Sequence, residues 1–354
     1  MRVLHLLNSD RLSGAENVAV EIINGFDGEI EMAYSSSMGA IEKSLNERNV
    51  KYIPLRNFSK SEIKSVVMGY QPDIIHAHDI RSSIQAVRVA KKIPVISHIH
   101  GNHDDMKKAS LKSILYMLAS FKFKHIIGVS KSVVNDFKFS RLIRDKCSVL
   151  YNVISKDRVI KGVKNDSIEY DFDFVYLGRL SEPKNPSRIA RIASKVLVKV
   201  KYAKFGIIGE GNMVEEMKEI FIKNQVIDRV EFLGFMANPY KVLSQSNVMI
   251  MCSRYEGTPM AALEALSLGI PIVSTSTDGL VELIDDDING YISDDDDDFA
   301  NKVSSIIIQK KLFERLSAGA KEKSIDYTDM KKYKEKVLDI YSKCLGGKDG
   351  SDKL

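Results

Sequence analysis

The chain has 354 residues, of which 44% are hydrophobic and 28% are charged, a composition typical of a globular protein with two domains of ordinary size. It contains neither an apolar run of the ~18 residues that a membrane-spanning helix needs nor a secretory signal peptide at its start. The three cysteines have no metal-binding spacing, which favours a reducing cytoplasm. Basic residues predominate in residues 1–165 and acidic residues in the remainder, so we expect the first half to meet an anionic partner.

Short apolar segments alternate with helical patterns through the first half of the chain. Strands are expected at residues 2–7, 31–36, 50–55, 73–79, 93–101, 125–129 and 148–153. Such alternation predicts an α/β domain with a parallel sheet. The first strand leads into a helix through a loop with Ser13 and Gly14, but this loop lacks the G-x-G-x-x-G fingerprint of dinucleotide-binding proteins.

Histidines gather at the ends of two expected strands: His76 and His78, then His98, His100 and His103. Residues i and i+2 of a strand share a face, so a zinc site is geometrically possible. Histidines that hydrogen-bond to the backbone are the more ordinary alternative, and we predict no metal site. His100, followed by Gly101, lies at the carboxyl end of its strand, where open α/β sheets bind ligands. We therefore predict that His100 is a site residue, with His98 as the alternative.

Residues 107–124 combine an apolar helical stripe with flanking lysines. The stripe consists of Leu111, Ile114, Leu115 and Leu118, and the lysines are Lys107, Lys108, Lys112, Lys122 and Lys124. This composition is typical of a helix that lies on an anionic membrane surface. The alternative is an amphipathic helix whose apolar face packs on the domain core. No nucleic-acid-binding motif is present, so we predict no nucleic-acid partner.

A polar stretch at residues 152–167 predicts a linker between a first domain, 1–165, and a second domain, 166–329. The second domain is expected to open with a strand at 172–177, followed by Arg179 and Lys184 on a loop bent by Gly and Pro. Two cations at the end of a strand can neutralise a diphosphate. Further strands are expected at 204–208, which is followed by a turn beginning at Gly209, and at 230–235, which contains Leu233.

The most informative stretch is residues 248–266. An apolar run at 248–251 predicts a buried strand, Gly257 and Pro259 mark a tight loop, and a helix follows from Met260. The unpaired N–H groups and the dipole of a helix start make an anion site, which commonly takes phosphate. Two carboxylates, Glu256 and Glu264, flank this helix start with seven residues between them. The arrangement fits a nucleotide-sugar, with the diphosphate at the helix start and hydroxyls on the carboxylates.

Acidic runs at 285–287 and 294–298 could be mistaken for a metal site. The second run directly precedes an apolar-periodic segment at 299–308, so we predict a helix cap and a solvated face instead. The last periodic segment, 330–345, is expected to be a basic amphipathic helix, and we expect the tail at 346–354 to be disordered.

The Glu-x7-Glu spacing, followed by Gly-Ile-Pro-Ile-Val-Ser-Thr at 269–275, resembles the donor-site signature of family 4 glycosyltransferases. These are retaining enzymes with the GT-B fold, an α/β architecture of two Rossmann-like domains whose parallel sheets face each other across a cleft. The loop at 178–185 resembles the family's Gly-Arg…Lys-Asn motif, and residues 13–16 resemble its Gly-Gly-x-Glu loop, with Ser13 where Gly is common. The resemblance also implies that the helix at 330–345 crosses back to the first domain.

The resemblance implies a role for each matching residue. Glu264 would bind the ribose, and Glu256 and His100 would contact the transferred sugar. Cations and the helix start would hold the diphosphate, with further contacts from the first loop and near the base. The residues implied are Gly14, Arg179, Lys184, Gly209, Leu233, Gly257, Thr258, Pro259 and Met260.

We therefore expect a retaining glycosyltransferase of the hexosyltransferase type, with a UDP-sugar donor suggested by the family and with no metal cofactor. The basic first half favours a lipid-linked saccharide acceptor, and hence polysaccharide or glycoconjugate biosynthesis. The protein would be cytoplasmic or peripheral at the inner face of the cell membrane. The alternatives are a sugar-nucleotide epimerase or hydrolase of the same architecture, and a non-catalytic nucleotide-sugar-binding protein.

Overall fold

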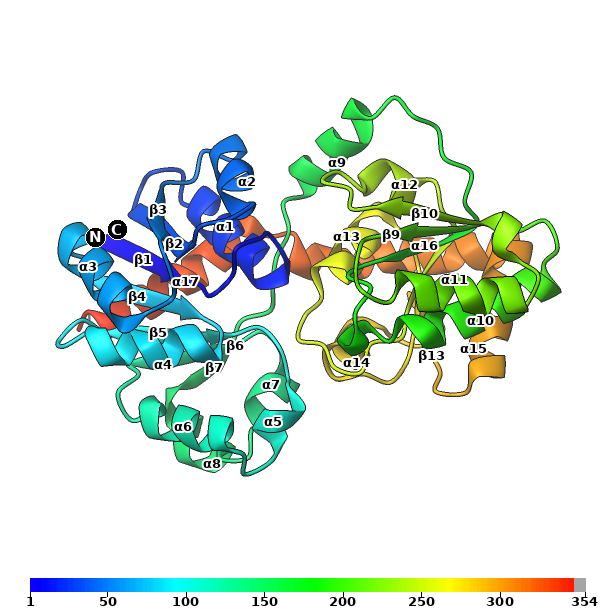
Figure 1. Ribbon diagram of the computed structural model, residues 1–354. Coiled ribbons are helices and arrows are strands. Elements are labelled where there is room, and N and C mark those ends of the chain that lie inside the picture. Colours follow the sequence, from blue (N-terminus) through cyan, green and yellow to red (C-terminus); the bar gives the residue numbers. More distant parts are fainter. Residues whose placement is uncertain (347–354) are drawn as a thin grey trace. The chain divides into compact units, whose positions relative to one another are not determined.

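The computed structural model describes residues 1–346 and divides the chain into two compact units. The first unit comprises Met1–Val153 together with the chain from Asp329 onward, and the second comprises Ile154–Thr328. Each unit is a parallel sheet with helices on both faces (Figure 1).

The sheet of the first unit has seven parallel strands in the order β3-β2-β1-β4-β5-β6-β7. Their bounds are β1 Arg2–Leu6, β2 Glu31–Ser37, β3 Tyr52–Leu55, β4 Ile74–His78, β5 Val95–Ile99, β6 His125–Gly128 and β7 Cys147–Val149. The strand order reverses between β1 and β4. Open α/β sheets bind ligands at such a switch point, outside the carboxyl ends of the strands.

Helices cover both faces of this sheet, because successive side chains of a strand point to opposite faces. Leu4 and Leu6 join the apolar core that includes α3, α4 and α6, whereas Leu7 packs in the smaller core with α1 and α2. The helices are α1 Gly14–Gly25, α2 Ile41–Glu47, α3 Lys60–Tyr70, α4 Ile80–Val89, α5 Asp104–Lys107, α6 Leu111–Ser120, α7 Lys131–Asn135, α8 Ser140–Ile143 and α17 Met330–Cys344.

The second unit repeats this topology with six parallel strands in the order β10-β9-β8-β11-β12-β13, and its switch point lies between β8 and β11. The strands are β8 Phe174–Leu177, β9 Phe205–Ile208, β10 Val230–Gly234, β11 Val248–Met251, β12 Ile272–Ser274 and β13 Gly290–Ile292. The helices are α9 Lys156–Asn165, α10 Pro186–Lys199, α11 Val214–Lys223, α12 Tyr240–Ser244, α13 Met260–Leu268, α14 Asp278–Leu283, α15 Asp296–Ile308 and α16 Lys310–Ser324. Short 3-10 turns occur at η1 Arg144–Lys146, η2 Glu182–Lys184, η3 Ile227–Arg229 and η4 Ile325–Tyr327.

The boundary between the units differs from the sequence expectation. Most of the stretch expected as a linker is α9, which belongs to the second unit, so the first unit ends at Val153 and not at residue 165. Asn238 donates a hydrogen bond to the carbonyl of Gly162 at 2.8 Å, and a Cβ at Gly162 would lie 2.3 Å from the ring of Tyr240. A short helix with a single buried residue, Val159, has the same polar composition as a linker.

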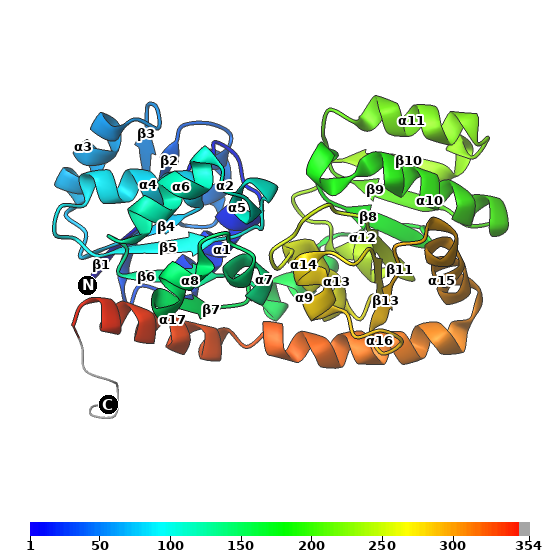
Figure 2. The ribbon, with the colours of Figure 1, turned by 90° about the horizontal axis from the view of Figure 1, so that it is seen from below.

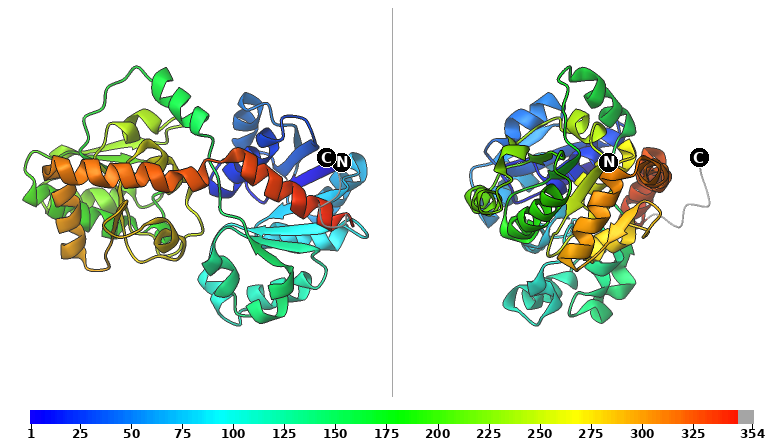
Figure 3. Two further views of the ribbon diagram at one scale, coloured as in Figure 1. Left: turned by 180° about the vertical axis from the view of Figure 1, so that it is seen from behind. Right: turned by 90° about the vertical axis from the view of Figure 1, so that its right-hand side faces the viewer.

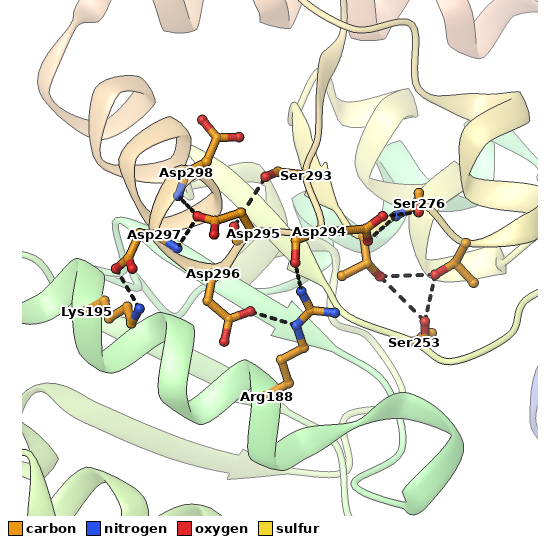
Figure 4. Close-up of polar contacts among 12 residues, drawn as sticks. Arg188, Lys195, Ser253, Ser276, Ser293, Asp294, Asp295, Asp296, Asp297 and Asp298 are labelled. Atoms are coloured by element: carbon orange, nitrogen blue, oxygen red, sulfur yellow. Dashed lines mark hydrogen bonds and ion pairs between the residues drawn. The ribbon is translucent and has the colours of Figure 1, made fainter.

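The acidic run at 294–298 caps a helix, as predicted. Asp295 accepts hydrogen bonds from two N–H groups of the next turn at 2.8 and 3.0 Å, and α15 begins at Asp296 (Figure 4). Asp296 pairs with Arg188 of α10 at 2.8 Å, and Asp297 pairs with Lys195 at 2.5 Å. These carboxylates therefore join α15 to α10 besides stabilising the helix start.

The last helix, α17, belongs to the first unit, where it runs along the sheet (Figures 2 and 3). The hydroxyl of Tyr341 shares a hydrogen bond of 2.8 Å with Nδ1 of His76 in β4. Lys334 pairs with Glu29. The tail expected at 346–354 lies, apart from its first residue, outside the described part of the chain.

We predict that Tyr341→Phe lowers the free energy of unfolding by about 1–3 kcal/mol, because it leaves a buried ring nitrogen of His76 without its partner. Urea denaturation monitored by circular dichroism measures the change. Tyr333→Phe is the matched control, since Tyr333 is also buried on α17 but its hydroxyl has no hydrogen-bond partner among residues 1–346. Equal losses in the two variants would contradict the role of the His76–Tyr341 bond.

Candidate functional site

Two strand ends meet at the switch point of the second unit. β8 and β11 are neighbours, so the loop that follows each of them emerges at the same edge of the sheet. The first loop contains Arg179 and ends in Lys184, and the second contains Ser253 and Glu256 and leads into α13. The two motifs that the sequence singled out separately therefore lie side by side.

Glu256 and Lys184 are in direct contact. The Nζ atom of Lys184 lies 2.5 Å from Oε1 of Glu256, and the hydroxyl of Ser253 donates to the same oxygen at 2.7 Å. Glu256 is only 7% exposed, and a buried carboxylate is stable when it is paired and hydrogen-bonded in this way. The sequence analysis assigned Lys184 to the diphosphate and Glu256 to the transferred sugar, and it did not predict that the two residues contact each other. It assigned no role to Ser253.

Main-chain and hydroxyl contacts hold both loops in place. The N–H of Arg254 donates to the carbonyl of Pro183 at 2.8 Å, and the hydroxyl of Thr277 donates to the carbonyl of Ser253 at 2.7 Å. The hydroxyl of Tyr176 in β8 donates to the carbonyl of Arg179 at 3.0 Å. The side chain of Arg179 is exposed and forms no ion pair with any described residue, so it offers a positive charge that is not already neutralised.

The start of α13 is packed tightly against the following helix. A Cβ at Gly279, in the first turn of α14, would lie 1.3 Å from the carbonyl oxygen of Gly257. Gly257 and Thr258 are buried, and Pro259 occupies the N-cap position before Met260. Helix geometry leaves the N–H groups of this first turn without intrahelical partners, so they can bind an anion. Position 279 therefore requires glycine, and the sequence did not indicate the close contact with Gly257 that causes this requirement.

Glu264 is held by residues from two other helices. Its Oε1 accepts a hydrogen bond from the hydroxyl of Tyr240 in α12 at 3.2 Å and lies 3.9 Å from Nη2 of Arg158 in α9. The guanidinium of Arg158 also lies over the ring of Tyr240, 5.7 Å from its centroid. Sequence reasoning missed both residues, since Arg158 fell in the expected linker and no local motif marks Tyr240.

Three glycines, Gly178, Gly209 and Gly234, are in close contact at the carboxyl ends of β8, β9 and β10. Gly209 has φ of +138°, and a Cβ on it would lie 1.9 Å from the carbonyl oxygen of Gly178. The N–H of Gly209 donates to the carbonyl of Gly234 at 2.8 Å. Gly209 is therefore required by the packing of these loops, and Leu233 lies half-buried beside it on β10.

Gly14 is the first residue of α1 in the first unit. Its helix is capped through Glu16, whose Oε2 accepts from the N–H of Ser13 at 3.1 Å and from its hydroxyl at 2.5 Å. A Cβ at Gly14 would meet nothing within 4 Å, and the residue is exposed. Neither packing nor backbone conformation requires glycine there.

His98 and His100, the two alternatives for a site histidine, differ in exposure. His98 is 0% exposed and shares a hydrogen bond of 3.1 Å with His76, whereas His100 follows β5 and retains some exposed surface. His100 shares a hydrogen bond of 2.9 Å with His78, and burial lowers its pKa to about 3, so its ring is neutral at physiological pH. The expectation that these histidines bond to the backbone is wrong, because they bond to one another.

Helix α6, at the centre of residues 107–124, exposes its most apolar face and buries the opposite face, which contains serines. Its buried residues are Ser113, Tyr116, Ala119 and Ser120. Leu111 is 75% exposed, Leu118 is 54% exposed, and Leu115 and Ile114 are exposed between them. The alternative in which the apolar stripe packs on the core is therefore wrong. Through residue 346, none of the helices is long and apolar enough to cross a membrane.

Two family models match the chain, one described as Glycosyltransferase Family 4 over residues 13–158 and one described as Glycosyl transferases group 1 over residues 160–323. An Escherichia coli UDP-Gal:alpha-D-GlcNAc-diphosphoundecaprenol alpha-1,3-galactosyltransferase is 24% identical over 96% of this chain and 96% of its own length. An uncharacterised glycosyltransferase of Methanocaldococcus jannaschii, MJ1059, is 29% identical over 60% of this chain, which spans 58% of that relative.

The fold matches solved structures over nearly its whole length. Anabaena Alr3699/HepE in complex with UDP-glucose superposes with a TM-score of 0.83 at 17% identity, covering 97% of this chain and 100% of the other. This likeness, with two parallel sheets of the same strand order, confirms the predicted GT-B fold. Because the two family matches together span both units, the chain belongs to the family 4 glycosyltransferases.

Proposed function

We propose that this glycosyltransferase moves a sugar from a UDP-sugar to a lipid-linked saccharide, with retention of configuration at the anomeric carbon. The observation that carries the proposal is the arrangement at the second unit's switch point, where the partly buried Lys184–Glu256 pair lies beside the start of α13. The UDP-glucose complex of Alr3699/HepE supports the choice of nucleotide, and the diphosphoundecaprenol substrate in the name of the Escherichia coli relative supports the acceptor.

In this proposal the donor binds to the second unit. Glu264, fixed by Tyr240, accepts hydrogen bonds from the ribose hydroxyls. Arg179 and the first turn of α13 bind the diphosphate, and Lys184 adds its charge from the Glu256 side. Glu256 then receives hydroxyls of the transferred sugar, with His100 as a second contact.

In the reaction, positive charge develops on the transferred sugar and negative charge on the leaving diphosphate, and the proposed residues stabilise the negative charge. As the bond from the anomeric carbon to the phosphate oxygen breaks, its electron pair stays on the phosphate and positive charge develops on the sugar. Arg179, Lys184 and the helix start stabilise the leaving diphosphate, where electrostatic stabilisation lowers the barrier most. The acceptor oxygen bonds to the same face of the anomeric carbon, and its proton passes to the departing phosphate, so no protein nucleophile is needed. Inversion at the anomeric carbon of the product would rule out this route.

We also propose that α6 docks the first unit on an anionic lipid surface. The exposed stripe of Leu111, Leu115 and Leu118 would enter the headgroup boundary, and Lys108 and Lys112 would meet the lipid phosphates. An exposed apolar face with a basic margin suits a membrane better than a protein partner, because α6 and the turn before it supply both kinds of contact. A lipid-linked acceptor would be presented at that surface.

Arg179→Ala should weaken binding of UDP and UDP-sugars by roughly 10- to 100-fold, because a charge-assisted contact to the diphosphate is lost. Thermal shift with UDP-, GDP- and ADP-sugars, followed by calorimetry, measures the change and identifies the base. Arg191→Ala, an exposed arginine of α10, is the control and should bind like the wild type. A folded wild-type protein that no nucleotide-sugar stabilises would refute the proposed donor site.

Glu256→Gln should separate nucleotide binding from sugar binding. Because Lys184 is released from its partner, the variant should bind UDP as well as the wild type or better, while the additional affinity for the UDP-sugar falls roughly tenfold or more. Calorimetry with UDP and with the UDP-sugar gives both values, and the control is Glu219→Gln, which alters an exposed residue of α11. An equal loss of affinity for both ligands would show that Glu256 does not contact the sugar.

Replacing Leu115 and Leu118 by Ser should abolish binding to vesicles of phosphatidylcholine and phosphatidylglycerol, since each exposed leucine contributes at least about tenfold when it is buried in lipid. Co-sedimentation measures the bound fraction, and vesicles of phosphatidylcholine alone test the need for anionic lipid. Ile222→Ser, which alters a residue of the second unit that is 60% exposed, should bind like the wild type. If the double variant also binds normally, α6 is not the docking surface.

A further inference from the structure

Five histidines form a polar layer on the α17 side of the first unit's sheet. Four of them lie in the neighbouring strands β1, β4 and β5, where alternate residues share a face, and the fifth directly follows β5. The members are His5, His76, His78, His98 and His100. The first four are 0% exposed, so their ring nitrogens need partners within the protein.

The rings are joined into two hydrogen-bonded rows. In the first row, Nδ1 of His5 pairs with Nε2 of His78 at 2.9 Å, and Nδ1 of His78 pairs with Nε2 of His100 at 2.9 Å. The ring centroids in this row are 5.2 and 5.1 Å apart, and the ring planes are inclined to each other by 29° and 15°. The row crosses three strands and ends at His100, at the carboxyl edge of the sheet.

Proton counting restricts this row to two arrangements. Burial lowers the pKa values of His5 and His100 to about 3 and that of His78 well below its usual value, so each ring is neutral and carries one N–H. Two of the three protons occupy the two hydrogen bonds. The third must be at one end of the row, either on Nε2 of His5 or on Nδ1 of His100.

The two ends are not equivalent. Both terminal nitrogens are buried without a hydrogen-bond partner among residues 1–346, but His5 is enclosed on every side, whereas His100 reaches the edge where ligands bind. An orphaned buried N–H is rarely tolerated, so the proton is better accommodated on His100, which is partly exposed, than on enclosed His5. All three rings then carry their proton on Nδ1.

We propose that His5 and His78 are positioning residues that hold His100 in its Nδ1–H tautomer, as a neutral hydrogen-bond donor to an oxygen of the sugar substrate. Only one of the two proton arrangements is favoured, because the other would place an unpaired N–H on enclosed His5. His100 would therefore discriminate in favour of a substrate oxygen that accepts a hydrogen bond. The contact with the sugar rests on the proposed function, whereas the tautomer is a property of the free protein.

The second row does not have a fixed direction. It joins Tyr341, His76 and His98 through contacts of 2.8 and 3.1 Å. The tyrosine hydroxyl can donate or accept, so either arrangement of protons is possible. Three-histidine groups of the layer also have ring nitrogens within 4.8 Å of one another, a spacing that suits a metal ion.

The tautomers are measured directly by long-range ¹⁵N–¹H correlation spectra of protein labelled on histidine, treated with chelator and free of nucleotide. We expect His5, His78 and His100 each to show a protonated Nδ1 and an unprotonated Nε2. His78→Leu should return His100 to the Nε2–H form that free histidine prefers, whereas His125→Gln should leave the row unchanged, since His125 bonds to Ser148 on β7.

Three results would overturn the proposal. One is an Nε2–H tautomer of His100 in the wild type, which would mean that the row runs the other way. Another is a His100 tautomer that His78→Leu does not alter. The third is loss of the row's N–H signals with one equivalent of Zn²⁺, which would make the layer a metal site. The wild-type spectrum decides the direction even if the variant does not fold.

Binding then tests the link to the substrate. His78→Leu and His100→Ala should each weaken binding of the UDP-sugar roughly fivefold to tenfold and leave UDP binding unchanged, and the double variant should lose no more than either alone. Additive losses would show that His78 does not act through His100. If the spectra show the expected tautomers but no variant changes the affinity for the UDP-sugar, the row does fix the tautomer of His100, and the proposed contact of His100 with the sugar is wrong.

Discussion

The ion pair between partly buried Lys184 and buried Glu256 fixes the geometry of the second unit's switch point. It joins the loop after β8 to the loop after β11, and Ser253 satisfies the same carboxylate oxygen. Removing Lys184 would leave the buried carboxylate of Glu256 without a compensating charge, which is destabilising. The loops are therefore set before any ligand arrives, and an incoming diphosphate can share Lys184 without having to order it.

The two units place different chemistry at the same topological position. The second unit presents charges at its switch point, with Arg179 exposed and Glu264 fixed by Tyr240. In the first unit, burial keeps the histidine rings neutral, and hydrogen bonds between rings replace ion pairs. A charged group suits a diphosphate, whereas a neutral donor suits a hydroxyl, because a hydroxyl gains little from a full charge that must first be desolvated.

Local patterns predicted the fold and marked most of the residues that meet at the second unit's switch point, because strand alternation, glycine turns and the Glu-x7-Glu spacing are all short-range signals. The sequence could not pair Lys184 with Glu256, since residues 72 apart meet only through the sheet order. The same limit hid Arg158 and Tyr240 as partners of Glu264, and it concealed α9 within an apparent linker. His5 was missed because a single histidine in an apolar strand carries no local signal, although the strand register places it opposite His76.

Helix α6 illustrates why an amphipathic pattern does not by itself say which face is buried. Beneath α6 the sheet presents Ser97, whose hydroxyl shares hydrogen bonds with Ser83 at 2.7 Å and with Tyr116 at 2.8 Å. Tyr116 supplies apolar contacts with Phe123 and Phe137 as well, so the buried face of α6 is well packed although it contains serines. Because these polar groups would lose their partners if the helix were rotated, the leucine stripe must face outward. The exposed stripe is therefore a consequence of how α6 attaches to the sheet.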